Sequence, residues 1–440
     1  MDCGYPIGRA VRLTKGDRMS GDCGTRTWRG GSVSLWLAGA ALGGTACGDG
    51  RSVEPSVDGS DAAQTTLVTS TVPPFDLVSA GLTHNCAIST DDRAFCWGSN
   101  VFAQLGDGTA TERSLPVPVT GGRLFTRISA GYYSTCAVTP ASKAYCWGGN
   151  NFGQLGDGTM LRRYEPRAVR GDHLFRQVSM GSEHACGVTT DDQAFCWGLN
   201  TFGQLGTGTT APDGVHALKP VAVTGMLRFR EVTVGNYHSC GVTTDNRAYC
   251  WGGDQWGQIG DGSGSGTCGL VWSPQACRPK PTLVAGGYRF RQVDAGGGHG
   301  PGEGGGGTDG GHTCGVTTDN RALCWGEGQH GQNGDGTLNL RKAPVLVAGG
   351  LAFQSVSVGE SHVCGVTTGS VPYCWGYNWA GQLGDGTVTQ RNQPKLVSGG
   401  RLFRQVSAAT AFTCGTTLGN VAFCWGAGGS RTPTRVGGSN

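Results

Sequence analysis

Apolar and polar residues alternate along short segments of this chain, and one arrangement of such segments returns seven times, about every fifty residues. Each copy begins with a segment like Phe403–Val406 and continues through a pair of segments that contain two cysteines, as in His312–Gly326. A Gly-rich turn such as Gly153–Thr159 follows, and a segment such as Pro116–Val119 ends the copy. Alternation with a period of two, interrupted by Gly, Asp and Asn, predicts about four short strands in each copy.

A fixed period of this length indicates an array of identical supersecondary units. Closing the array into a ring removes the exposed sheet edges that an open β array would present. We therefore predict an all-β chain, a seven-bladed β-propeller of four-stranded antiparallel blades over residues 74–437, followed by a short tail at 438–440. The last copy lacks the Gly-Gln-Leu-Gly-Asp-Gly stretch but keeps Thr432–Val436, so we expect a complete seventh blade with one shortened loop.

Two cysteines ten positions apart occur in every copy. A three-residue loop within Thr317–Arg321 would place Cys314 directly opposite Cys324, at a Cα separation of about 4.5 Å that suits a disulfide. The last loop residue must then be left-handed, a conformation that Asp and Asn tolerate and that Ser142 and Ser370 favour less. We predict one cross-strand disulfide in each blade. The pairs are Cys86–Cys96, Cys136–Cys146, Cys186–Cys196, Cys240–Cys250, Cys314–Cys324, Cys364–Cys374 and Cys414–Cys424.

The other face of each hairpin is patterned as well. Ala87 is expected opposite Phe95, with Trp97 beside them on the same face. Small residues packed against large ones allow adjacent sheets to nest at a constant spacing. We therefore assign the repeated Trp to the core rather than to binding. These residues are Trp97, Trp147, Trp197, Trp251, Trp325, Trp375 and Trp425.

The chain has nineteen cysteines, and the regular pairing of fourteen of them indicates an oxidising compartment. Arg26 and Arg29 precede an apolar stretch, Val33–Ala46, which ends in small residues before Cys47. This pattern is typical of an export signal and is too short to span a bilayer. Its ending resembles that of a bacterial lipoprotein signal, so we expect 1–47 to be a signal peptide with Cys47 as the lipidated residue. Plain signal cleavage and a start at Met19 stay open.

The remaining cysteines support this division of the chain. When Cys3, Cys23 and Cys47 are set aside, sixteen are left, which are the seven repeat pairs and Cys268 with Cys277. Residues 48–73 are polar and aperiodic, which predicts a flexible linker.

The fourth repeat is irregular, with an insertion over residues 263–311 in and after it. A segment closed by Cys268 and Cys277 and carrying Trp272 favours a contact-making loop, although a neutral surface insertion is equally compatible.

The formal net charge of +3 and the absence of a dense basic run argue against a nucleic-acid partner. No copy contains a Ser-His-Asp arrangement or a distinctive pair of carboxylates, and the Gly-rich Gly302–Gly311 lacks the Lys-Ser/Thr of a phosphate-binding loop. We therefore expect a protein that is not an enzyme and uses no cofactor.

At this point the residues resemble a known family. The phrases His-Thr-Cys-Gly-Val-Thr, Tyr-Cys-Trp-Gly, Asn-x-x-Gly-Gln-Leu-Gly and Pro-x-x-Val are similar to the regulator of chromosome condensation repeat across the whole of 74–437. The resemblance implies a propeller, whose eukaryotic founder is a nucleotide exchange factor for a Ran-type GTPase and binds chromatin. An exported chain would not meet that GTPase, so we do not expect exchange activity. Secreted bacterial propellers that inhibit β-lactamases act in a compartment more like the one expected for this chain.

Two repeated polar positions are candidates for metal binding. Metal ligands must converge within about 2.1 Å of one ion, and His residues on separate blades would lie too far apart. The family resemblance instead implies that these His form structural hydrogen bonds. The Asp of the Gly-Asp-Gly-Thr turns lacks the alternating ligands of a calcium loop, which favours turn formation. We expect no metal. The residues concerned are His84, His184, His238, His312 and His362, and Asp107, Asp157, Asp261, Asp335 and Asp385.

Aromatic residues precede Gly-Gln in most copies and should lie in the same loop of each blade, on one face of the disc. Exposed aromatics on a rigid platform suit a protein- or glycan-binding surface, and the alternative is that each packs beneath a neighbouring loop. Our predicted binding residues are Phe102, Phe152, Phe202, Trp256 and Trp379, together with Trp272; His330 stands in the fifth copy. A second candidate set comprises Tyr132, Tyr133, Tyr237 and Phe412.

These observations predict a monomeric, non-enzymatic binding module of the bacterial cell envelope. It would be exported to the periplasm or cell surface, attached to the membrane through a lipid anchor alone, and bind a protein or glycan partner. A structural envelope scaffold and a secreted inhibitor of the β-lactamase-inhibitor type are the alternatives.

Overall fold

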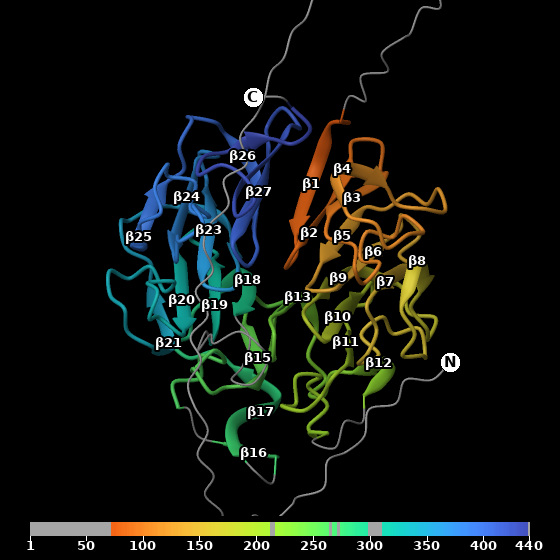
Figure 1. Cartoon of the computed structure of the whole chain (residues 1–440). Helices are drawn as coiled ribbons and strands as arrows, with labels where there is room; N and C mark the ends of the chain where they lie inside the picture. Colours follow the sequence, from red (N-terminus) through yellow and green to blue (C-terminus); the bar gives the residue numbers. More distant parts are fainter. Residues whose placement is uncertain (1–71, 212–215, 264–265, 271–272, 298–309, 439–440) are drawn as a thin grey trace, which may run out of the picture. The chain divides into compact units, whose positions relative to one another are not determined.

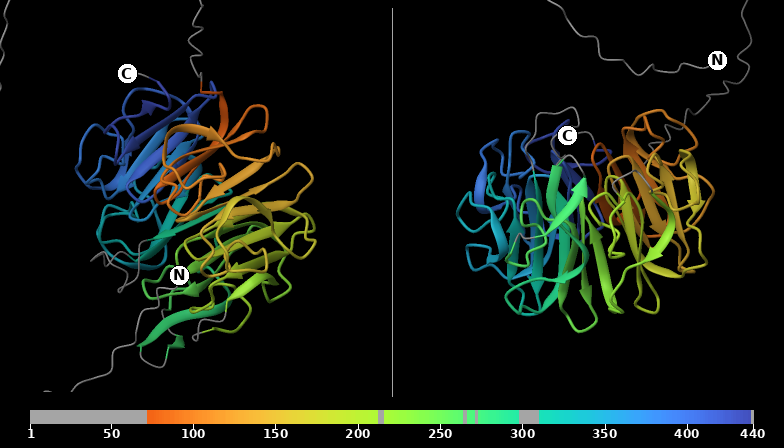
Figure 2. Two further views of the ribbon diagram at one scale, coloured as in Figure 1. Left: turned by 45° about the vertical axis from the view of Figure 1, so that its right-hand side comes forward. Right: turned by 90° about the horizontal axis from the view of Figure 1, so that it is seen from below.

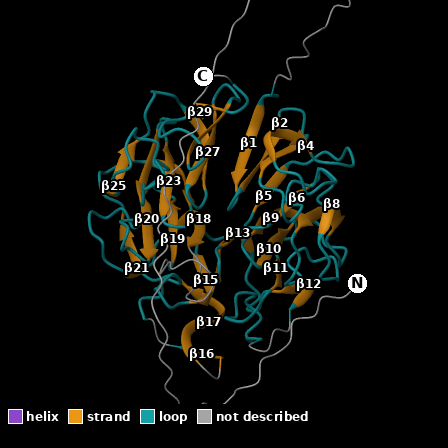
Figure 3. Ribbon diagram, viewed as in Figure 1, coloured by secondary structure: helices purple, strands orange, loops and turns teal. Residues whose placement is uncertain are grey.

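The computed structural model describes residues 72–211, 216–263, 266–270, 273–297 and 310–438, which fold as seven antiparallel sheets around a common axis (Figure 1). Strands and loops make up this part of the chain (Figure 3). Within it, no helix has the length and apolar character needed to cross a bilayer. The predicted signal peptide with Cys47, most of the linker and Trp272 lie outside the described residues.

The strand bounds follow the repeat. Blades one to three contain β1 (Phe75–Ala80), β2 (His84–Ser89), β3 (Ala94–Gly98), β4 (Arg113–Pro118), β5 (Arg127–Ala130), β6 (Ser134–Val138), β7 (Ala144–Gly148), β8 (Arg163–Ala168), β9 (Phe175–Met180), β10 (His184–Thr189), β11 (Ala194–Gly198) and β12 (Ala217–Ala222). Blades four and five contain β13 (Phe229–Val234), β14 (His238–Thr243), β15 (Ala248–Gly253), β16 (Thr267–Leu270), β17 (Ser273–Leu283), β18 (Phe290–Gly297), β19 (Gly311–Thr317), β20 (Ala322–Gly326) and β21 (Arg341–Leu346). Blades six and seven contain β22 (Phe353–Val358), β23 (His362–Thr367), β24 (Pro372–Gly376), β25 (Arg391–Leu396), β26 (Phe403–Ala408), β27 (Phe412–Thr417), β28 (Ala422–Gly426) and β29 (Thr434–Arg435).

The strands of each blade pair antiparallel in chain order, except that β17 precedes β16 in blade four, and the first strand of every blade faces the axis. The ring closes where β1 meets β26 and β27, the two ends of the colour range in Figure 1, and Figure 2 shows the sheets side by side from below. The predicted seven-bladed propeller is therefore confirmed. Blade four carries a fifth strand, β16, from the insertion, and blade seven is complete although β29 has only two residues.

The hairpin geometry predicted from cysteine spacing is confirmed. Cys314 pairs with Cys324 in the β-ladder, and the other six pairs have the same register. All seven predicted disulfides are formed, with Cα–Cα distances of 4.0–4.1 Å. The last loop residue is left-handed in every blade, including Ser142 (φ 59°) and Ser370 (φ 63°), because the loop length imposes this conformation regardless of side-chain preference.

The core consists of one apolar cluster between each pair of adjacent blades. The cluster between blades four and five contains the Cys240–Cys250 disulfide on one side and Phe290 and Trp325 on the other. Trp325 is fully buried, and the other repeated Trp are at most 7% exposed, which confirms their assignment to the core. Burial of each large ring contributes about 2–3 kcal/mol, so the interfaces between blades supply much of the stability.

Side chains of the innermost strands connect each blade to the next around the axis. The oxygen of Ser79 accepts a hydrogen bond from the backbone N–H of Ala130 in the following blade, at 2.9 Å. The same contact occurs at every blade boundary, and Ser407 closes the ring by accepting from Ala80 at 2.9 Å. At each boundary, one side-chain oxygen thus provides a hydrogen-bond acceptor for a backbone N–H of the next blade that no neighbouring strand reaches.

Candidate functional site

The loops that carry the predicted aromatic residues are held by a repeated Asn and Gln. In blade one the side chain of Asn100 accepts a hydrogen bond from Leu105 N at 3.0 Å, and Gln104 Oε1 accepts from Phe102 N at 2.8 Å. The equivalent contact in blade six is made by Ala380 N, at 3.0 Å from Gln382 Oε1. Trp379 therefore stands one position before the aromatics of the other blades, and its side chain is 60% exposed.

The other predicted aromatic residues are half-buried and pack against neighbouring loops. The ring centroid of Phe102 lies 4.5 Å from that of Tyr133, and Phe202 lies 5.2 Å from Tyr237. Trp256 packs against the backbone of Gly310, where an added Cβ would fall 2.2 Å from the indole. In blades one, three and four these rings thus support the next blade.

Two of these rings and three members of the second aromatic set come together in one depression, which is lined by loops of blades one to four. We call it the loop-face pocket. It has a volume of about 180 Å³. Its lining comprises Phe102, Tyr132, Tyr133, Phe152 and Tyr237, with Gly149, Asn150, Asn151, Gln154, Ser182 and Glu183. Aromatic walls beside amide, hydroxyl and carboxylate groups can pack on the apolar face of a sugar or side chain and orient its polar groups.

Tyr132 holds the inner wall of the loop-face pocket. Its hydroxyl donates a hydrogen bond to Gly297 O of blade five at 3.2 Å and accepts one from Asn236 Nδ2 of blade four at 2.8 Å. Burial, together with the nearby charge of Glu360, raises the pKa of Tyr132 well above its usual range. The phenol therefore stays neutral and bridges three blades across the axis.

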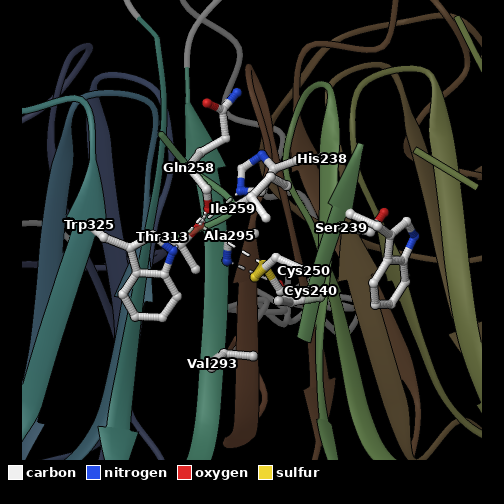
Figure 4. Close-up of a disulfide and its surroundings, with 12 residues drawn as sticks. His238, Ser239, Cys240, Cys250, Gln258, Ile259, Val293, Ala295, Thr313 and Trp325 are labelled. Atoms are coloured by element: carbon white, nitrogen blue, oxygen red, sulfur yellow. Dashed lines mark hydrogen bonds between the residues drawn. A yellow bond between two sulfur atoms is a disulfide. The ribbon is translucent and has the colours of Figure 1, made fainter. Parts of the chain in front are cut away.

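The repeated His forms part of a hydrogen-bonded chain between blades (Figure 4). His238 Nε2 lies 2.9 Å from Thr313 Oγ1, and the Thr313 hydroxyl donates to Gln258 O at 2.9 Å. Trp325 Nε1 donates to the same carbonyl at 2.9 Å. Because the Thr313 proton is used on Gln258, the imidazole must donate through Nε2–H. Burial lowers the pKa of His238 to about 3, so the ring is neutral.

The same contact joins His84 to Thr135, His184 to Ser239 and His362 to Thr413. The expected structural hydrogen bonds are thus confirmed at four of the repeated His. Among the residues with described placement, no group of three or more His, Cys, Asp or Glu is positioned to hold a metal ion.

The repeated turn Asp has a structural role as well. Asp107 accepts hydrogen bonds from Thr109 N at 3.0 Å and forms an ion pair with Arg113 at 2.9 Å. Partial burial opposes ionisation of Asp107, but the bonds from Thr109 and Arg113 outweigh it and hold its pKa below the usual value. The corresponding pairs in four other blades confirm that this Asp stabilises the turn.

Sequence reasoning missed two acidic residues inside the axial channel, a polar cavity of about 490 Å³ between the innermost strands. Gln177, Gln292 and Gln405 each donate to a backbone carbonyl of the next blade. Glu231 takes this position in blade four and accepts from Val293 N at 2.9 Å. Burial, with a smaller contribution from the charge of Asp294, raises the pKa of Glu231 to about 7.

Asp294 takes the position that Ser occupies in most blades. Its carboxylate accepts hydrogen bonds from the Thr233 hydroxyl at 2.7 Å and from Val358 N at 2.8 Å. Burial raises the pKa of Asp294 to about 6 in spite of these bonds. The sequence signal for Asp294 was its departure from the Ser of five blades, and the signal for Glu231 was a carboxyl at a position that Gln holds in three blades.

The insertion of blade four contains the β16–β17 pair, joined by the predicted Cys268–Cys277 disulfide with a Cα–Cα distance of 5.6 Å. Trp272 itself lies outside the described residues, so its contact role stays a prediction.

Family comparison gives matches along most of the propeller. Two models of the regulator of chromosome condensation (RCC1) repeat match, one at residues 75–104, 125–154, 175–204, 229–258 and 310–332, the other at 91–138, 142–188, 191–242 and 369–416. A search of curated proteins found no match.

Among solved structures, human WBSCR16 is 17% identical, with a TM-score of 0.65 over 78% of this chain and 87% of that chain. Prp20p from Saccharomyces cerevisiae, described with its binding properties to Gsp1p and histones, is 20% identical, with a TM-score of 0.64 over 78% of this chain and 82% of that chain. At these identities the likeness concerns the fold.

Proposed function

Because this chain belongs to the RCC1 repeat family, we propose that it is a non-enzymatic binding module that holds a partner on the loop-face pocket. Propellers of this family provide rigid platforms that can mediate protein binding. The disulfide in every blade indicates folding in an oxidising environment. We further propose that the protein is exported to the cell envelope and attached to the membrane through a lipid on Cys47.

The observation that carries the proposal is the convergence of Phe102, Phe152, Tyr133 and Tyr237 around one cavity. Rings fixed by packing lose little conformational entropy when a partner binds. The amides, Ser182 and Glu183 add polar groups at its edge, a composition that suits a protein segment or a glycan. The partner therefore contributes an apolar face with hydrogen-bonding groups around it.

A structural scaffold is the second candidate, and the packing of Phe202 and Trp256 beneath neighbouring loops favours it for those blades. The two functions differ in the effect of removing rings from the pocket. A scaffold loses stability only, whereas a binding module loses a partner while it remains folded.

The test uses the full oxidised chain on a resin with solubilised envelope extract and with soluble envelope oligosaccharides. Bound proteins and glycans are identified by mass spectrometry, and the affinity of each is then measured with the purified component. The variant is Phe102→Ala/Phe152→Ala, and the matched control is Trp379→Ala, which removes an exposed ring from the same loop of blade six. Loss of a partner by the double variant alone supports the proposal. Equal binding by all three proteins would overturn it and favour the scaffold.

A further inference from the structure

A second surface lies on the outer rim, away from the loop-face pocket. The cleft between the outer strands of blades two and three has a volume of about 670 Å³, within the range of about 300–1,000 Å³ that is usual for ligand sites. We call it the rim cleft. Its lining comprises Asp157, Thr159, Arg163, Arg167, Ala168, Val169, Arg170, Gly171, Asp172 and Lys219.

The rim cleft is assembled by a contact between two blades. Gly158 of the blade-two turn donates a backbone hydrogen bond to Leu218 O of β12 at 2.8 Å. The side chain of Arg170 lies over the same turn, because a Cβ added at Gly158 would fall 3.1 Å from Arg170 Cδ. Lys219, the next residue of β12, faces the cleft from the blade-three side.

The charges of the rim cleft are unbalanced. Arg163 is neutralised by Asp157 at 2.6 Å, as the equivalent arginines are in four other blades. Within the described residues, none of the ion pairs includes Arg167, Arg170 or Lys219, and Asp172 is the one further carboxylate in the lining. Glu165 of the same strand lies beside Gly108 of the preceding blade rather than in the cleft. Two guanidinium groups and an ammonium group therefore lack a carboxylate partner among the residues that the structure describes.

These cations depart from the chain's own repeat. Arg167 pairs with Cys146, and the residues that pair with the same cysteine in the other blades are Val117, Val221, Thr282, Val345 and Thr434, with a cation again at Lys395 of blade six. Arg170 N bonds to Gly156 O, a contact made in other blades by Thr120, Thr224, Ala285, Ala348 and Ser398. The fold accepts neutral residues at both positions, so the repeat does not require arginine there.

We propose that the rim cleft binds an anionic polysaccharide through the sulfate or carboxylate groups of successive sugars. Guanidinium groups bind such oxyanions in a bidentate manner, and the lysine adds a third cation. The lining contains no aromatic side chain on which a base could stack, which argues against single-stranded nucleic acid. Three cations across one cleft match a short stretch of charged sugars.

The test measures binding of the full oxidised chain to heparin and to polygalacturonate, which separate sulfate from carboxylate recognition, with neutral dextran as a blank. Arg167→Val/Arg170→Thr installs the residues of blade one and should weaken binding at least about tenfold. Lys342→Ala/Lys395→Val removes the same charge from the rim of blades five and six and should stay within about twofold of the parent. Unfolding curves confirm that both variants fold.

Three results would overturn the proposal. The first is no binding of either polyanion, and the second is equal weakening by the two variants, which would reflect net charge alone. The third is tighter binding of a single-stranded oligodeoxynucleotide than of both polysaccharides. Tight binding of only heparin or only polygalacturonate supports the site and identifies the anion.

Discussion

The interface between blades seven and one, here called the closing seam, differs from the six internal seams between successive blades. At an internal seam a Gln carbonyl of one blade accepts the indole N–H of the next, as Gln258 does for Trp325. Blade seven has no Gly-Gln-Leu-Gly stretch, and Trp97 is 7% exposed where the other six Trp are at most 1% exposed. The outer half of the closing seam therefore lacks the loop that covers the Trp and accepts its indole N–H at the other seams.

The inner half of the closing seam is complete. Phe75 N donates to Asn420 O at 2.8 Å, the same contact that links the other blades. Two side chains of β26 form hydrogen bonds to β1 across the boundary. Ser407 Oγ accepts from Ala80 N, and Gln405 Nε2 donates to Val78 O. An apolar cluster of Phe75, Phe95 and Trp97 with Ala409 and its neighbours fills the space behind. Closure of the ring thus depends on the axial strands, and the loops over the Trp residues strengthen the internal seams.

The largest expected effect on stability comes from replacing the Trp residues of the two kinds of seam. Trp325→Ala should lower the free energy of unfolding by about 3–5 kcal/mol, because it leaves a large cavity and removes one of the two hydrogen bonds to the Gln258 carbonyl. Trp97→Ala should cost about 1 kcal/mol less, since Trp97 makes no such bond in the described structure and is already partly exposed. Guanidinium unfolding of the oxidised proteins measures both. An equal or larger loss at Trp97 would show that the two seams are equivalent.

A smaller effect on stability is expected at Glu231, which joins blade four to blade five through its hydrogen bond from Val293 N. The folded pKa of Glu231, about 7, lies above the value of 4.5 expected for an exposed Glu. The contribution of this carboxyl to folding stability is therefore fully present below pH 4.5 and is lost as the pH rises through 7, where the buried group ionises. Glu231→Gln, which restores the residue used by other blades, should raise stability by about 2 kcal/mol at pH 8 and change little at pH 4.

Unfolding of the parent and Glu231→Gln proteins at both pH values measures this effect, and Gln405→Glu should introduce the same pH dependence at the closing seam. A stability difference that is independent of pH would contradict the role given to the Glu231 carboxyl.

The smallest effect on stability is expected from selective reduction. Cys424 is the one repeat cysteine that is not fully buried, because the shortened loop of blade seven leaves it less covered. Mild reductant under native conditions should open Cys414–Cys424 before the other six repeat disulfides, with the propeller still folded. Alkylation and peptide mapping by mass spectrometry follow the order. Simultaneous reduction of all seven would indicate global unfolding instead.

The candidate site was predictable in part. The sequence placed Phe102 and Phe152 in the same loop of successive blades, and the structure brings them to one pocket with Tyr133 and Tyr237. The sequence also shows that Trp379 lies one position earlier in its loop, because Ala380 separates it from Gly381 and Gln382, but our prediction grouped it with the other aromatic residues. The cations of the rim cleft were also overlooked, since Arg170 and Lys219 are separated by a full repeat.

The sequence by itself determined the number of blades, the strands in each and the disulfide partners. These features follow from alternation and loop length within about ten residues, where backbone geometry leaves one register. The tertiary structure alone decided the contacts between blades, such as His238 with Thr313, the bridge of Tyr132 across the axis and the buried carboxyl of Glu231. Those contacts join residues fifty or more positions apart, and their distances depend on the twist and spacing of closed sheets, which no local pattern specifies.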